Sequence, residues 1–128
     1  PLLDRIDMHI EVPSVEYEAM RRKEKPETSA QVRARVNAAR ELQKQRFSGT
    51  GVSCNAYMTP AMIGQYCLLD AAGERLMKGA FDRLGLTGRS HDRILRMART
   101  IADLDASPDI QAAHLAEAIQ YRSSTLLK

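Results

Sequence analysis

The sequence lacks the long apolar runs of membrane proteins and the leader of secreted proteins, and it has few aromatic residues. Tryptophan is absent, and only four tyrosines and two phenylalanines occur among 128 residues. No apolar run is long enough to cross a membrane, and no basic leader precedes an apolar stretch and a cleavage site. We therefore expect a soluble cytoplasmic domain. Its core must be built from Leu, Ile, Val, Met and Ala, which supply most of the 44% hydrophobic content.

Cysteine and histidine are also scarce. Cys54 and Cys67 are the two cysteines, and two thiols thirteen residues apart do not make a disulfide framework. We expect both to be reduced. The histidines, His9, His91 and His114, are scattered along the chain. A metal site needs several ligands at close spacing, so no metal ligands are predicted.

The sequence lacks the motifs that bind nucleotide phosphates. A phosphate-cradling loop of the form GxxxxGK[ST] does not occur. Gly49-Thr50-Gly51 lacks the lysine that would follow, so it is interpreted as a flexible turn. Ile10-Glu11-Val12 is short and lacks the acidic pair of a magnesium-holding strand. We expect this chain alone not to hydrolyse ATP.

The net charge of +3 hides an asymmetry. Nine basic and three acidic residues lie between Arg21 and Arg46, a local charge of +6, so the rest of the chain carries −3. Such a segment is typical either of a nucleic-acid contact or of a solvated linker and helix face. No aromatic residues alternate with these charges, so a base-stacking surface is not expected.

Capping residues and apolar spacing predict a chain of helices. Thr28 or Ser29, Thr59 followed by Pro60, Asp70 and Thr87 are suited to helix starts. The predicted helices cover about 28–47, 60–68, 71–85, 88–105 and 111–122. Alternation from Ile6 to Val12 predicts a strand, and the connector after it is partly helical around Tyr17 to Arg21. The predicted fold class is mainly α, a helical bundle with one short N-terminal strand.

The segment Gly88 to Leu104, GRSHDRILRMARTIADL, carries four arginines at spacings of four, three and three. On a helix this spacing predicts one face of guanidinium groups, made of Arg89, Arg93, Arg96 and Arg99. Apolar residues such as Ile94 and Ala98 lie toward the opposite side. The arginine face is either a solvated surface or a surface that meets phosphates or acidic partners.

Four segments together carry a family resemblance: LLDRID near the start, HIEVP after it, RILRMARTIADL, and HLAEAIQYR at His114 to Arg122. In this order and spacing they resemble the C-terminal part of the magnesium-chelatase-like AAA+ ATPases, in particular the ComM/YifB group. The resemblance covers nearly the whole chain. It implies a ring-forming ATPase whose catalytic core lies upstream of Pro1. Residues 1–27 would be the end of that core, and residues 28–128 its C-terminal helical lid.

The resemblance also implies roles for individual residues. Arg5 resembles the arginine finger, which reaches in trans to the γ-phosphate of a neighbouring subunit's ATP, and Asp4 would support it. Arg89 resembles the second sensor, which contacts nucleotide phosphate from the lid. Arg93 is the fallback for this role. Arg96 and Arg99 are expected to be structural or to lie between subunits.

The expected cofactors are ATP and magnesium in the full-length parent, with none in this fragment. The expected partners are subunits of the same protein in a ring and DNA, with branch migration during recombination of incoming DNA as the process. Two alternatives remain. One is a magnesium chelatase ATPase subunit that drives metal insertion into a porphyrin. The other is a stand-alone helical nucleic-acid-binding module that uses the basic 21–46 segment.

Overall fold

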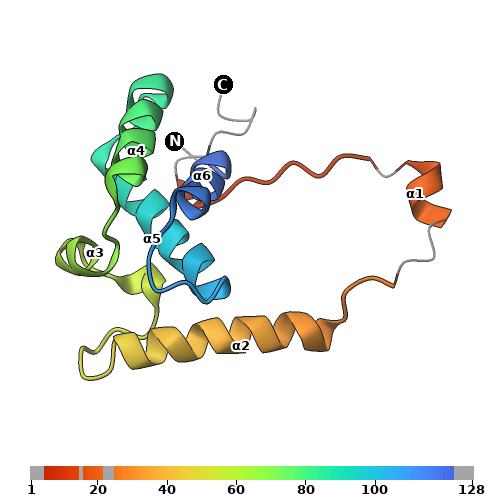
Figure 1. The fold of residues 1–128 in the computed structure, drawn as a ribbon, viewed down its shortest axis with the longest axis horizontal. Helices are drawn as coiled ribbons and strands as arrows, with labels where there is room; N and C mark the ends of the chain where they lie inside the picture. Colours follow the sequence, from red (N-terminus) through yellow and green to blue (C-terminus); the bar gives the residue numbers. More distant parts are fainter. Residues whose placement is uncertain (1–4, 15, 22–24, 123–128) are drawn as a thin grey trace.

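The fold is a bundle of helices around one central helix (Figure 1). The computed structural model describes residues 5–14, 16–21 and 25–122. Its helices are α1 (Tyr17–Arg21), α2 (Ser29–Arg46), the short 3-10 turn η2 (Asn55–Tyr57), α3 (Pro60–Tyr66), α4 (Ala71–Leu84), α5 (Gly88–Leu104) and α6 (Ala112–Gln120). α5 packs against α2, η2, α3 and α6, and α4 packs against α6. The predicted mainly α class is confirmed.

Local chemistry sets most of the helix ends. The side chains of Thr28, Thr59, Asp70 and Thr87 each accept a hydrogen bond from a backbone N–H in the first turn that follows. α4 ends at Gly85, whose φ of 62° lies in the left-handed region that glycine adopts without strain. These starts and this stop are the predicted ones.

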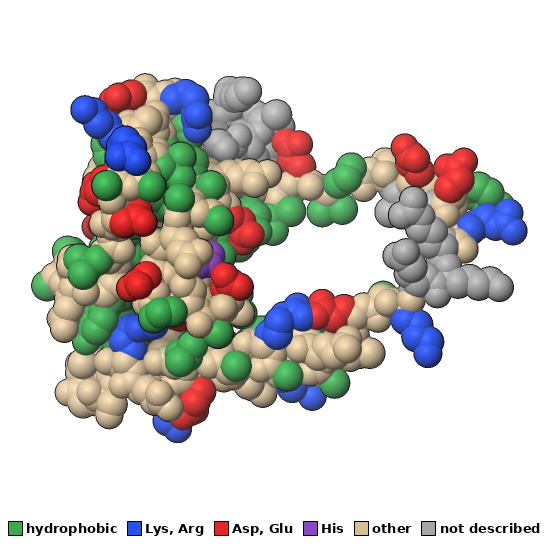
Figure 2. Space-filling view, viewed as in Figure 1, with side chains coloured by type: hydrophobic (Ala, Val, Ile, Leu, Met, Phe, Trp, Pro, Cys, Tyr) green, Lys and Arg blue, Asp and Glu red, His purple; other side chains and the backbone are tan. Residues whose placement is uncertain are grey.

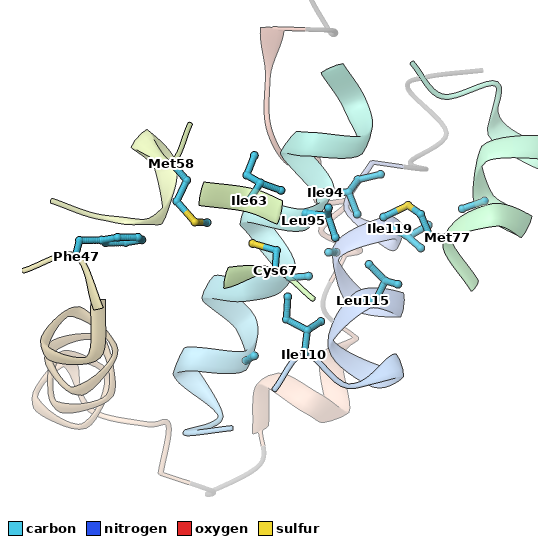
Figure 3. Packing of buried hydrophobic residues seen from close by; sticks show 14 residues of the cluster. Phe47, Met58, Ile63, Cys67, Met77, Ile94, Leu95, Ile110, Leu115 and Ile119 are labelled. Carbon is cyan, nitrogen blue, oxygen red and sulfur yellow. The ribbon is translucent and has the colours of Figure 1, made fainter. Parts of the chain in front are cut away.

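The core is formed mainly by α5 and α6 with residues from the shorter elements around them. Ile94 and Ala98 of α5 and Leu115 of α6 are fully buried. Met77 of α4 points toward Ile119 of α6 (Figure 3). Cys67 lies within this core, and burial raises the pKa of its thiol to about 11, so the thiol stays protonated at neutral pH.

The predicted strand from Ile6 to Val12 is wrong. The described ranges contain no ladder of paired strands, and the isolated pairing of Leu69 with Ile110 is the one bridge there. The segment is extended, but no neighbouring strand offers it backbone partners, and Val12 is 85% exposed. Instead it is tied to the end of α6. The His9 N–H donates to the Tyr121 carbonyl at 2.7 Å, and Arg122 donates to the Ile6 carbonyl.

Beyond His9 the chain leaves the bundle. It runs outward to α1 and returns to the start of α2, as Figure 1 shows. We call residues 10–20 the arm; Val15 within it is not described. None of the helices in the described part is both long and apolar enough to span a membrane.

Candidate nucleotide-contact site

The four arginines of α5 lie in four different environments. Arg89 is exposed in the first turn of the helix, and among the described residues it has no hydrogen-bond or ion-pair partner. Thr87 caps this turn by accepting a hydrogen bond from the Ser90 N–H at 3.2 Å. A fixed first turn therefore presents a solvated guanidinium group.

Arg93 and Arg96 lie next along the helix and are drawn into contacts. The Arg93 side chain is 13% exposed, and its Nε lies 3.5 Å from Oδ1 of Asp7. Arg96 donates through Nε and Nη2 to the Met58 carbonyl, at 3.3 and 3.0 Å. Both arginines and Asp7 line a small pocket of about 270 Å³. The N-terminal segment thus crosses α5 at this point.

Arg99 is part of the interior. Its residue exposure is 3%, and its guanidinium donates to the carbonyls of Pro108 and Ser107 at 3.1 and 2.8 Å. The prediction of a single four-arginine face is therefore wrong. Arg99 follows Arg89 by ten residues, which at about 3.6 residues per turn leaves its side chain about 80° around the helix axis from that of Arg89. That rotation turns Arg99 toward the connection between α5 and α6.

A buried polar cluster lies beside Arg99. Asp103, whose side chain is fully buried, accepts hydrogen bonds from Arg46 at 2.7 and 2.8 Å and from Asn55 Nδ2 at 2.8 Å. Arg99 Nη2 lies 3.2 Å from the same carboxylate. The hydrogen bond to Asp103 raises the pKa of Arg46 above its ordinary value, and the negative charge of Asp103 adds to this effect. We call Asp103, Arg46, Asn55 and Arg99 the Asp103 cluster.

The Asp103 cluster joins three elements. Arg46 ends α2, Asn55 begins η2, and Asp103 lies in the last turn of α5. The Asn55 N–H donates to Gln43 Oε1 at 2.9 Å, which adds a second link between η2 and α2. Sequence reasoning missed Arg46, Asn55 and Asp103. The only local signal was the spacing of Arg99 and Asp103, four apart on one helix face.

The other predicted site residues lie at the N-terminal end. Arg5 is exposed and has no hydrogen-bond or ion-pair partner among the described residues, while Asp4 lies outside them. The structure links the segment of Arg5 to α5 through the pair of Asp7 and Arg93. Within the described part of the chain, no group of three or more His, Cys, Asp or Glu residues is placed to hold a metal ion.

Comparison with known proteins places this geometry in a family. Residues 26–122 match the family described as "Magnesium chelatase, subunit ChlI C-terminal". The chain is 39% identical over 128 residues to the competence protein ComM of Haemophilus influenzae, covering 99% of this chain and 24% of that protein. It is 39% identical over 124 residues to the uncharacterized protein YifB of Escherichia coli, covering 96% of this chain and 24% of that protein. An uncharacterized protein of Mycobacterium bovis is 32% identical over 124 residues, covering 97% of this chain and 24% of that protein.

The chain thus spans about a quarter of the length of the curated relatives it matches. The family match covers α2 to α6, the capped helices that form the bundle and the Asp103 cluster. The long matches to ComM and YifB extend over the arm and the N-terminal segment as well. On these grounds the chain belongs to the magnesium chelatase ChlI C-terminal family, and within it to the ComM and YifB relatives.

Proposed function

We propose that this chain is the lid of a ring-forming ATPase and that Arg89 contacts nucleotide phosphate from the lid. The observation that carries the proposal is the contrast among the arginines of α5. Arg89 alone is both exposed and without a partner among the described residues, whereas Arg93, Arg96 and Arg99 bind within the chain. A guanidinium held on a capped turn and left unpaired is suited to bind phosphate oxygens through parallel hydrogen bonds.

Arg5 has the second role in this proposal. Its exposed guanidinium would reach the γ-phosphate of ATP bound to a neighbouring subunit. ATP with magnesium supplies the phosphoryl group, and negative charge spreads over its oxygens at the transition state, where a positioned guanidinium stabilises it. The described residues would supply cationic contacts of this kind, and in this proposal the phosphate cradle and the magnesium ligands are assigned to the part of the parent upstream of Pro1.

The Asp103 cluster would make the lid respond as one body. It fastens α2 and η2 to α5, the helix that carries Arg89. A displacement of Arg89 on ATP binding or hydrolysis would then move α2 together with α5. The pair of Asp7 and Arg93 lies where the N-terminal segment crosses the same helix, close in sequence to Arg5. Lid rotation and the position of Arg5 would thereby be coupled.

DNA is the proposed substrate of the parent, with branch migration as its activity. The support is the similarity to a relative named as a competence protein and the basic segment from Arg21 to Arg46. The second candidate is a chelatase subunit that drives metal insertion into a porphyrin, favoured by the description of the matching family as the C-terminal part of a magnesium chelatase subunit. Stimulation of the full-length ATPase by branched DNA supports the first. Stimulation by a porphyrin with magnesium, and none by DNA, supports the second.

Alanine substitutions in the full-length protein test the arginine roles. Arg5→Ala should abolish hydrolysis while nucleotide binding persists, because this arginine acts on a neighbour's ATP. Activity should return in part when the Arg5→Ala variant is mixed with a variant that has an inactive phosphate-binding loop and retains Arg5.

Arg89→Ala should lower turnover roughly tenfold to a hundredfold, which is the contribution of one charged hydrogen bond. Arg75→Ala, an exposed arginine on α4, is the matched control and should leave the rate unchanged. Parental ATP hydrolysis in both Arg5→Ala and Arg89→Ala would refute the assignment.

A further inference from the structure

The arm carries apolar and acidic side chains that the described chain does not cover. Ile10, Val12, Tyr17 and Met20 are 61%, 85%, 69% and 71% exposed. The described part of the arm contains three glutamates, and its exposed Glu16 and Glu18 flank Tyr17. α1 itself ends with the exposed Arg21, whose guanidinium carbon lies 5.8 Å from the centre of the Tyr17 ring, so the acidic character belongs to the glutamates before it. In Figure 2 the arm stands clear of the bundle, with acidic side chains gathered where it turns at α1. Exposed apolar side chains at this density mark a contact surface.

A groove of the opposite character lies at the other end of α2. It has a volume of about 1030 Å³ and runs between α2 and the loop that follows it. Its lining is mainly apolar and includes Val36, Phe47, Val52 and Leu104. Arg40 and Lys44 also line it, and none of the described residues that line it is acidic. A groove of this size can hold a short peptide segment, since pockets of similar volume bury drug-sized ligands.

We propose that the arm of one copy of this chain docks in the groove of a second copy. The apolar side chains of the arm would cover Val36 and Leu104, which are 37% and 45% exposed. Glu16 and Glu18 would pair with Arg40 and Lys44. The arm and the groove are complementary both in charge and in apolar surface. This favours the arm of a second copy over a nucleic acid, whose phosphates would leave the apolar lining of the groove uncovered.

The placement of the two surfaces favours a second copy over the chain's own groove. The arm is held at its start, where the His9 N–H binds the Tyr121 carbonyl, and it rejoins the bundle at the start of α2. Lys44 lies about 22 Å further along that helix from Ser29. Each copy offers one arm and one groove, two different surfaces, so the contact is head-to-tail and propagates into a ring or a chain. The proposal does not depend on any role of Arg89 in nucleotide binding.

Charge reversal on each surface tests the docking in this 128-residue chain. Analytical ultracentrifugation over a range of concentrations should show association of the unaltered chain, weakened by salt. The groove variant Arg40→Glu/Lys44→Glu and the arm variant Glu16→Lys/Glu18→Lys should each weaken association by about tenfold or more. Mixing the two variants should restore association, because each reversed arm then meets a reversed groove.

A matched control carries the same charge change elsewhere. Lys78→Glu/Arg83→Glu alters two exposed residues of α4 and should associate as the unaltered chain does. Circular dichroism checks that every variant keeps its helices. The proposal is overturned if the unaltered chain stays monomeric throughout, if either variant associates as well as the control, or if mixing restores nothing. A compaction that is independent of concentration would show docking within one chain and would also overturn it.

Discussion

At the scale of single residues, Asp103 connects more elements of the fold than any of the arginines around it. Its side chain is fully buried, and Arg46, Asn55 and Arg99 all lie within hydrogen-bond or ion-pair distance of it. A buried carboxylate is tolerated when its partners replace the hydration it loses. Here the partners come from three elements, so one side chain sets the relative positions of α2, η2 and α5.

Asp103→Ala should therefore be strongly destabilising. The substitution leaves the Arg46 and Arg99 guanidinium groups close together without their shared anion, and removing one partner of a buried pair costs about 3–5 kcal/mol. The free energy of unfolding, measured by urea titration, checks this. Asp82→Ala removes an exposed carboxylate on α4 and should change it by less than about 0.5 kcal/mol. Equal effects of the two substitutions would mean that the Asp103 cluster contributes little to stability.

At the scale of elements, the helices were predictable and the polar joints between them were not. Helix starts depend on neighbouring residues, and Thr28, Thr59, Asp70 and Thr87 each cap the helix that the sequence assigned to them. The prediction of a strand from Ile6 to Val12 was wrong because a strand needs a neighbouring strand to pair with, and alternating apolar residues do not show whether one is present. The contact of Arg46 with Asp103 spans 57 positions, beyond any local pattern.

The end of α4 offers a test of local backbone control. Gly85→Ala should lower the free energy of unfolding by about 1–2 kcal/mol, because alanine is strained in the left-handed region. A Cβ atom added at Gly85 would meet no described atom within 4 Å, so the expected loss of stability comes from backbone strain and not from a steric clash. Gly79→Ala, within the same helix and also with open space, should instead raise stability by about 0.5–1 kcal/mol. Thermal or urea unfolding decides the sign of each, and a stabilising Gly85→Ala would contradict the assigned backbone conformation.

At the scale of the whole molecule, the N-terminal segment meets the bundle around Ile6 to His9. Its contacts among the described residues include the pair of Asp7 and Arg93, the hydrogen bond from His9 to Tyr121, and that from Arg122 to Ile6. The core lies between Phe47 and Ile119 and includes none of the described residues of the arm. This arrangement agrees with the expected boundary near residue 27, which stays a prediction.

Two truncations would test that boundary. A chain of residues 28–128 should unfold cooperatively, with a free energy of unfolding lower by about 1–2 kcal/mol. Among the described residues it loses the hydrogen bonds of Ile6 and His9, the pair of Asp7 with Arg93 and the exposed pair of Glu27 with Arg35, and exposed pairs contribute little. A chain that begins at Phe47 should be far less stable, because removal of Arg46 and Gln43 strips the Asp103 cluster of its α2 partners. Urea unfolding followed by circular dichroism distinguishes the two. If residues 28–128 lose cooperative unfolding, α2 needs the N-terminal segment to hold its place, and the boundary lies nearer the chain's start.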